Sequence, residues 1–286
     1  AEILVYQAGS ETSGVQQKQI QQIRSELGLE RPVVIQYLSW IGGAVRGDFG
    51  KSYAQRRPVW DILRERFPRS MELAILTLAI ALLWAIPLGV ISAVHQNGPL
   101  DYLARIASLS GLSIPLFVTG ALILYGLVRV FHWIPPLEFV AFTEDPVENL
   151  KQLIWPALAQ AYYISAPITR LTRSQMLEVI RQDYVRTARA KGLAERAVIY
   201  RHALRNSLLP VVTFVGWWGG RLLGGLVIME IIFVVPGMGT ALVQAVSQRD
   251  YPTVQAMVFV MAVVFLVVNL VVDLLYVWLD PRIRYA

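Results

Sequence analysis

Apolar and polar stretches alternate along the last three quarters of this chain. Crossing a bilayer takes about 20 predominantly apolar residues in a helix. Proline and glycine inside such helices are tolerated where neighbouring helices satisfy the freed backbone groups, so we expect these helices to pack against one another. We therefore predict an all-α membrane protein with five spans. The predicted spans are Met71–Val94, Leu103–Phe131, Leu153–Ile168, Leu208–Val235 and Val254–Leu279.

The first 69 residues are more polar, with about as many charges as a soluble protein carries. We expect an amphipathic helix with Ile20, Ile23 and Leu27 on one side, ending near Gly28. Residues 33–45 form a second amphipathic piece that is too short to span a bilayer. The pattern predicts an extramembrane segment over residues 1–69, lying on the membrane surface, and a transmembrane domain over residues 70–286.

Composition supports the membrane assignment and narrows the chemistry. Hydrophobic residues make up 55% of the chain and charged residues 16%, whereas soluble domains carry about a quarter charged residues. The chain has no cysteine, which excludes disulfides, thiolate catalysis and cysteine metal sites. The net charge of +6 does not require a nucleic-acid partner, because cytoplasmic loops of membrane proteins collect Lys and Arg.

The distribution of charge predicts the orientation. Residues 170–207 hold nine Lys and Arg side chains, while residues 132–152 hold four acids and one Lys. The excess of positive charge on cytoplasmic loops places residues 170–207 and the C-terminus inside, and residues 132–152 and 1–69 outside. Residues 1–69 would need an apolar segment to start translocation, and the chain begins with Ala1. We therefore expect a missing N-terminal span, giving six spans in the intact protein.

The Gly-rich fourth span carries candidate pathway residues. Gly216, Gly220 and Gly224 recur every four residues, which suits either intramolecular helix packing or a dimer interface around a pore. Arg221 lies near the middle of this span, where a charge is costly. It either lines a pathway and meets a substrate carboxylate or polar group, or it pairs with a carboxylate such as Asp273 or one from a partner subunit. Glu230 is expected to bond the loop backbone or cap the turn that follows it.

The segment 183–210 is basic and Ala-rich and is interrupted once, at Gly192. The pattern predicts a helix that ends with Gly192 in the left-handed conformation, and a second helix after it. The small side chains at Ala188, Ala190 and Gly192 would let the groove of a partner protein come close. In the second helix the residues expected on one face are Ala197, Tyr200, Leu204 and Leu208.

Alternatives to a protein partner are a lipid-binding or nucleic-acid-binding receptor or scaffold, and an enzyme. A nucleic-acid surface would interleave its basic residues with stacking aromatics, and residues 183–210 hold only Tyr184 and Tyr200. Gly50-Lys51-Ser52 resembles the end of a phosphate-binding loop, but Val45 stands where that loop needs glycine. The sequence therefore predicts a non-catalytic protein without an ATP site of its own.

Several motifs together resemble one family. The runs YVRTARAKGL and RHALRNSLLP, together with RRPVWDILRERFPRSMELA, LSIPLFVTG and VVPGMG, resemble the permease subunits of ABC importers, in the peptide/nickel group. The resemblance covers essentially the whole chain. It implies the transmembrane-domain fold of a type I ABC importer, with a first span before residue 1. It also implies transport of peptides, or alternatively of a nickel chelate, a glutathione-like peptide or an oligosaccharide.

The resemblance also implies site residues. The segment around Gly192 resembles the coupling helix that inserts into a groove of a separate ATPase, and the ATPase-coupling residues are Tyr184, Thr187, Ala188, Ala190, Gly192, Leu193, Arg196 and His202. The residues expected at the translocation pathway or interface are Gly216, Gly220, Arg221, Gly224, Glu230, Pro236 and Gly237. This chain departs from the family pattern at Thr187, where the general signature has an acid, and at Arg221, which is not expected in that span.

The implied partners follow from the same resemblance. They are a second, related permease, two ATP-binding cassette ATPases that bind ATP and Mg, an extracytoplasmic substrate-binding protein and the lipid bilayer, with no nucleic acid. No cofactor is expected in this chain. The implied location is the bacterial inner membrane.

Overall fold

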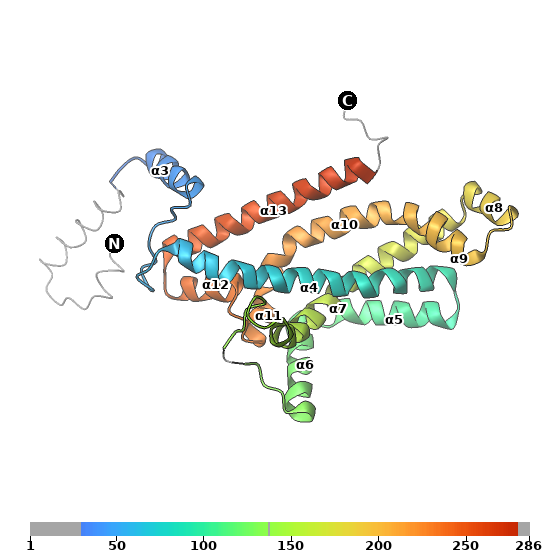
Figure 1. Ribbon diagram of the computed structural model, residues 1–286, viewed down its shortest axis with the longest axis horizontal. Helices are drawn as coiled ribbons and strands as arrows, with labels where there is room; N and C mark the ends of the chain where they lie inside the picture. Colours follow the sequence, from blue (N-terminus) through green and yellow to red (C-terminus); the bar gives the residue numbers. More distant parts are fainter. Residues whose placement is uncertain (1–29, 137, 280–286) are drawn as a thin grey trace, which may run out of the picture. The chain divides into compact units, whose positions relative to one another are not determined.

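The computed structural model describes residues 30–136 and 138–279. Over these residues the chain forms helices and no strand (Figure 1), which confirms the all-α prediction. Residues 33–45 form a short helix, α3, as predicted, whereas the helix expected around Ile20 to Leu27 lies outside the described residues. The elements are α3 (Val33–Val45), α4 (Val59–Val94), α5 (Pro99–Ser113), α6 (Leu116–Phe131), α7 (Pro146–Ile180), α8 (Asp183–Ala190), α9 (Glu195–Ala197), a π-helical segment (Val198–Ala203), α10 (Leu204–Gly225), α11 (Val227–Ile232), α12 (Met238–Ser247) and α13 (Tyr251–Leu279).

The chain divides into two compact units. The first unit contains the described residues up to Glu65 together with Leu242–Phe259, and the second contains Arg66–Ala241 and the chain from Val260 onward. The boundary expected between residues 69 and 70 stays a prediction. The helix of the first predicted span begins well before its apolar part, at Val59.

In the first unit, a buried carboxylate organises the loop after α3. Ser52 Oγ donates to Asp250 Oδ2 (2.5 Å), as does Thr253 Oγ1 (2.7 Å), and the Tyr53 N–H donates to Oδ1 (3.1 Å). Because Ser52 is 2% exposed and donates its hydroxyl to Asp250, the Gly50-Lys51-Ser52 run serves a structural purpose.

Membrane-crossing character is strongest in two helices. Helix α4 and the part of α13 from Tyr251 to Leu274 are each long and apolar enough to cross a membrane. Helices α5 and α6 are so only if the bent pair is counted as one span. The other two predicted spans correspond to the helices α7 and α10, which are less apolar than α4 and α13. Fifteen side chains of α7 between Asn149 and Met176 are buried within the protein, so these positions need not match a lipid environment.

Helix α7 is the centre of the second unit. Its side chains Leu153, Ile164 and Ile168 are almost completely buried in the main hydrophobic cluster. Neighbouring helices approach it through glycine. A Cβ on Gly89 of α4 would come within 2.6 Å of the Thr172 side chain, so this position of the first predicted span requires glycine.

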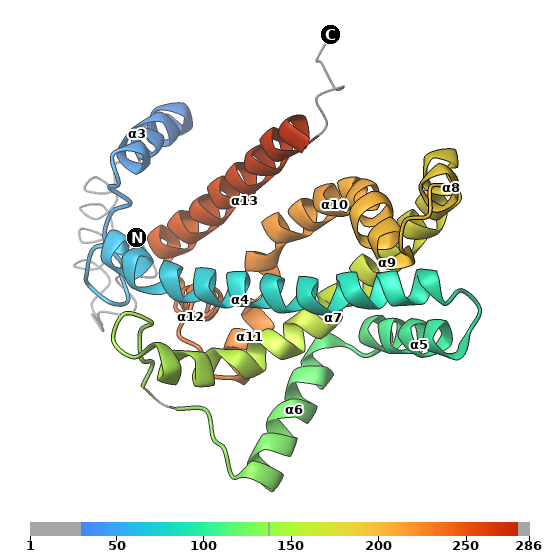
Figure 2. The same ribbon diagram turned by 45° about the vertical axis from the view of Figure 1, so that its right-hand side comes forward.

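The second predicted span is broken in two. The chain bends by 103° between α5 and α6, and the two helices point in clearly different directions (Figure 2). The helix breaks here because Pro115 cannot donate a backbone hydrogen bond and disfavours a helical conformation in the residue before it. Ile114 is accordingly extended, with φ −88° and ψ 124°. The prediction of one continuous helix over Leu103–Phe131 is therefore wrong, because two helices occupy this stretch.

Candidate functional site

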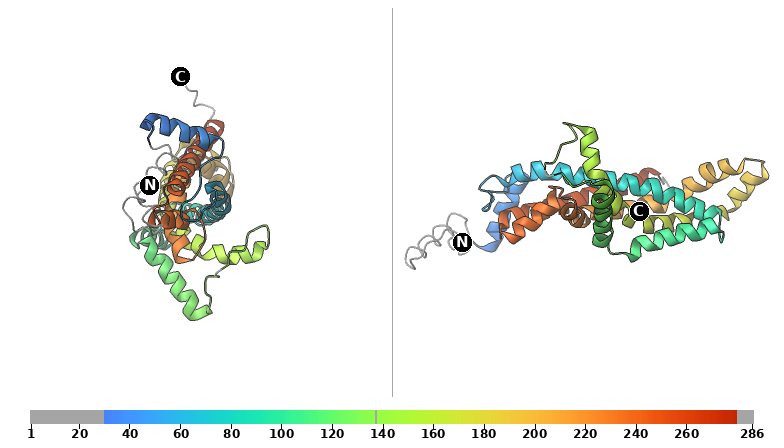
Figure 3. Two further views of the ribbon diagram at one scale, coloured as in Figure 1. Left: turned by 90° about the vertical axis from the view of Figure 1, so that its left-hand side faces the viewer. Right: turned by 90° about the horizontal axis from the view of Figure 1, so that it is seen from below.

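The basic segment folds as a hairpin of two short helices at one end of the second unit, where α7 ends and α10 begins (Figures 1 and 3). Gly192 lies between them with φ +75°, which confirms the predicted left-handed position. Its N–H donates to the Arg189 carbonyl at 2.9 Å. A Cβ at Gly192 would meet no atom within 4 Å, so the turn is open on its outer side.

The inside of the hairpin is apolar. Val185 and Ala188 of α8 pack against Val198 and against Val179 at the end of α7. Ala188 is 6% exposed, so its small size serves packing within the chain. Ala190 and Gly192 lie on the exposed side.

The buried face of the second helix differs from the one expected. Val198, Ile199, Ala203 and Ser207 are buried, whereas Tyr200 is 56% exposed. Of the residues expected on one face, Leu204 and Leu208 pack against the hydrophobic clusters, and the expectation is wrong for Tyr200. The segment from Val198 to Ala203 is π-helical, and its wider turn rotates the following side chains relative to an α-helix.

Polar contacts brace the turn of the hairpin. Arg189 donates to both carboxylate oxygens of Glu195, from Nη2 at 2.7 Å and from Nε at 3.1 Å. These hydrogen bonds and the charge of Arg189 lower the pKa of Glu195. The pair is therefore fully formed above the ordinary pKa of a glutamate, and it weakens only as the pH falls through the lowered value.

Two predicted coupling residues connect α8 to the helix that follows the turn. Asn206 Nδ2 donates to the Tyr184 hydroxyl oxygen at 2.7 Å, and the Tyr184 hydroxyl lies 3.4 Å from the His202 carbonyl oxygen. Tyr184 therefore ties the two arms of the hairpin together, and His202 contributes its backbone to this contact.

The outer surface of the hairpin combines apolar and basic groups. Leu193 is 43% exposed beside the open turn, and Thr187, Ala190 and Arg196 are exposed as well.

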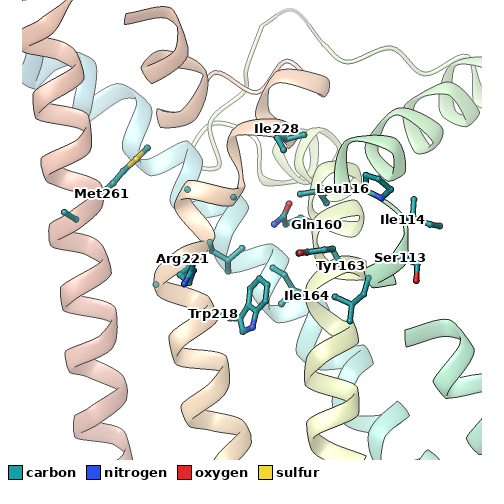
Figure 4. A pocket seen from close by; sticks show the side chains of 17 residues that line it. Ser113, Ile114, Leu116, Gln160, Tyr163, Ile164, Trp218, Arg221, Ile228 and Met261 are labelled. Atoms are coloured by element: carbon teal, nitrogen blue, oxygen red, sulfur yellow. The ribbon is translucent and has the colours of Figure 1, made fainter. Parts of the chain in front are cut away.

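The second feature is a half-open cavity of about 870 Å³ in the second unit (Figure 4). It lies between the bend joining α5 and α6, the middle of α7, the end of α10 and residues 261–262 of α13. Of the predicted pathway residues, Gly220, Arg221 and Gly224 line it.

The glycine stripe of α10 serves two purposes. A Cβ at Gly216 would overlap the Val272 side chain of α13, and one at Gly220 would come within 2.9 Å of Phe265. A Cβ at Gly224 would meet nothing within 4 Å. The first two glycines therefore permit packing within the chain, while Gly224 lies against open space in the cavity.

Arg221 is exposed, and its guanidinium lies 4.7 Å from the centre of the Trp217 ring. Within the described residues it forms no ion pair, with Asp273 or with any other carboxylate. Intramolecular pairing with Asp273, one of the two roles expected for Arg221, is therefore absent from this fold.

Glu230 organises the turn between α11 and α12. It is fully buried and accepts hydrogen bonds from Ser70 Oγ at 2.6 Å and from the Thr240 N–H at 2.9 Å. A Cβ on Gly237 would overlap its carboxylate. The expectation that Glu230 bonds the loop backbone is confirmed, and neither Glu230 nor its neighbours Pro236 and Gly237 line the cavity.

Sequence reasoning missed two cavity residues and one ion pair. Gln160 and Tyr163 of α7 face the cavity, and polar side chains in the middle of a predicted span were the available signal. Arg173 of α7 forms a buried ion pair with Asp101 at the start of α5, at 2.7 Å. Within the described residues, no cluster of three His, Cys, Asp or Glu side chains could hold a metal ion.

Comparison with known sequences identifies the relatives of this chain. Residues 85–285 match the family described as "Binding-protein-dependent transport system inner membrane component", and residues 9–74 match the N-terminal family of the same transport-system membrane components. The oligopeptide transport system permease protein AppB of Bacillus subtilis is 39% identical, over 95% of this chain and 87% of that protein. The glutathione transport system permease protein GsiC of Escherichia coli K12 is 38% identical, over 93% of this chain and 84% of that protein.

A solved structure shares the fold. The crystal structure of an amino acid ABC transporter with histidines aligns with a TM-score of 0.56 and 16% identity, covering 78% of this chain and 94% of that one. At this identity the likeness concerns the fold alone.

Proposed function

Because the chain belongs to the family of binding-protein-dependent transport system inner membrane components and is a permease subunit of the peptide ABC importer type, we propose that the hairpin around Gly192 couples it to separate ATPase subunits. The observation that carries this proposal is the open, left-handed turn at Gly192 beside the exposed Leu193. The chain itself supplies no chemistry at this turn. It transmits motion.

The hairpin is built to transmit force in both directions. Its inner side is a packed apolar cluster that includes Val179 at the end of α7, and its second arm runs without interruption into α10. Interiors packed in this way move as units. A displacement of the turn is therefore passed to the two helices that line the cavity.

The cavity is one half of the proposed translocation pathway. A second, related permease supplies the other half, and rocking of the two between inward-open and outward-open states moves the cargo. ATP binding to two partner ATPases favours one of these conformations. The coupling arises because ATP binds one conformation more tightly than the other. Peptides are the proposed cargo, because the relatives named above carry oligopeptides and glutathione.

The proposed orientation follows the charges of the loops. The basic hairpin faces the cytoplasm of a bacterial inner membrane, while residues 132–152 and 1–69 face outward. An external binding protein delivers peptide near residues 1–69 and 233–252.

The test is Gly192→Trp in the full transport complex. We expect loss of ATP-driven peptide uptake and of ATPase copurification, with normal membrane insertion, because the indole would occupy the space that the partner's groove needs. Gly192→Asn separates bulk from conformation, since asparagine tolerates the left-handed region, and it should retain much of the activity.

The matched control is Gly126→Trp on α6, where a Cβ would also meet nothing within 4 Å. It adds the same bulk far along the sequence from the hairpin and should leave ATPase copurification unchanged. Uptake at the wild-type rate by the Gly192→Trp variant would overturn the coupling role.

A further inference from the structure

The cavity holds one charged side chain, and among the described residues that charge has no counter-ion. Among the 17 residues that line the cavity, Arg221 alone is charged, and within the described residues it makes no ion pair. Its guanidinium lies over the Trp217 ring at 4.7 Å. A cation–π contact of this kind holds the side chain in place but leaves its N–H donors free for an anion.

A second polar group in the cavity lacks a partner. Gln160 is 3% exposed, and its Oε1 accepts no hydrogen bond from any part of the chain that the structure describes. Buried polar atoms are almost always hydrogen-bonded, so an unpaired carbonyl oxygen on a cavity wall indicates a donor that arrives with a ligand.

The hydroxyl end of Tyr163 points toward the side of the cavity on which Arg221 lies (Figure 4). The Tyr163 ring packs edge-on against Trp218, with 6.0 Å between ring centres. Aromatic side chains fixed in this way supply an apolar wall with a polar tip.

Apart from the Ser113 hydroxyl, which bonds the Leu109 carbonyl, and the indole N–H of Trp218, the rest of the lining is apolar or backbone. Ile114, Leu116, Ile164, Ile228 and Met261 line the cavity together with three glycines. Such a surface accepts many side chains and distinguishes few of them. Recognition is therefore confined to the few polar groups.

From these groups we infer that the cavity binds the carboxy-terminal end of a peptide. The terminal carboxylate binds the Arg221 guanidinium, a backbone N–H of the peptide donates to Gln160 Oε1, and the side chains lie against the apolar wall. This inference rests on the proposed transport of peptides, and it adds a recognition site within the permease itself. A volume of about 870 Å³ is within the usual range for small-ligand sites.

The experiment uses the complete complex in lipid nanodiscs, without the external binding protein, so that only the permease selects the ligand. The probes are trialanine and its C-terminal amide, each titrated to about 10 mM, a concentration that covers millimolar affinities. We expect the free acid to bind about tenfold or more tightly than the amide, because hydrogen bonds to charged groups are worth more than neutral ones. Equal binding of the two peptides, or no saturable binding of trialanine, would overturn the inference.

Three variants test which residues cause the preference for the free acid over the amide. Arg221→Gln should bind acid and amide alike, whereas Gln160→Met should weaken both by the same factor and keep their ratio. Arg105→Gln is the matched control, because Arg105 is also exposed and lies 5.8 Å from the Tyr102 ring, outside the cavity. It should leave both affinities unchanged.

Two outcomes separate this inference from its alternatives. If Arg221→Gln lowers recovery of the second permease during purification, the arginine pairs with a carboxylate of that subunit and the inference is wrong. ATP-driven trialanine uptake by the complete wild-type system tests the proposed function independently. If uptake occurs but acid and amide bind alike, only the carboxylate site fails.

Discussion

Asp101 is the residue at which three helices of the second unit meet. It is completely buried and accepts hydrogen bonds from Arg173 Nε and Nη2 of α7 (2.8 and 2.7 Å) and from Ser92 Oγ of α4 (2.5 Å). The Asn97 N–H also donates to it, at 2.9 Å. With every lone pair engaged, this carboxylate fixes the connection between α4 and α5 against α7.

Breaking this pair should cost far more than breaking an exposed one. Asp101→Asn should lower the free energy of unfolding by about 3–5 kcal/mol, because Arg173 would keep a charge without a counter-ion. The control is Lys151→Gln, which removes an exposed ion pair of 2.9 Å with Glu148 and should cost less than about 1 kcal/mol. Chemical denaturation of the purified protein in detergent measures both. Similar losses for the two variants would show that burial of the Asp101 pair does not matter.

The turn between α11 and α12 illustrates how one buried carboxylate supports an unfavourable backbone. Val234 has φ +56°, a conformation that is rare for β-branched residues. Glu230 and Ser70 hold the turn, since Ser70 Oγ donates to Glu230 and accepts from the Met238 N–H at 2.7 Å. The hydrogen bonds of the turn thus offset the strain at Val234.

Removing the Ser70 hydroxyl tests this support. Ser70→Ala should lower the free energy of unfolding by about 1–3 kcal/mol, because it leaves the buried Met238 N–H and Glu230 Oε1 each without that partner. Ser247→Ala serves as the control. Its exposed hydroxyl bonds only the Val243 carbonyl of its own helix, so its loss should change little. Melting in detergent distinguishes the two, and equal shifts would argue against the proposed role of Ser70.

The sequence predicted those elements that depend only on neighbouring residues. Gly192 in its left-handed turn and the short helix α3 followed from composition and spacing alone. The 103° angle at Pro115 did not, because proline marks a break without setting its direction. The exposure of Tyr200 was not predicted, because a π-helical turn leaves no periodic signature in the sequence.

At the scale of the molecule, the sequence indicated the cation of the site but not its surroundings. Arg221 stood out because a charge in an apolar span is costly. Gln160 and Tyr163 could be assigned to the cavity only from the fold, in which α7 and α10 line the same cavity. Glu230, Pro236 and Gly237, which the sequence predicts at the pathway or at an interface, lie at the turn before α12 and do not line this cavity. Proximity across 60 residues is a property of packing, which local patterns do not encode.

We propose that the hairpin around Gly192 contacts the ATPase, and one crosslinking measurement tests this contact directly. The chain contains no cysteine, so a single introduced thiol reports on one position. The measurement is crosslinking of Leu193→Cys in membranes of the complete system, using a thiol-to-amine reagent. Phe142→Cys is the control, because Phe142 is also exposed (55%) and lies in the loop predicted on the opposite side. We predict a crosslink to the ATPase from Leu193→Cys and none from Phe142→Cys. No crosslink from position 193, or an equal one from position 142, would show that the hairpin is not the ATPase contact.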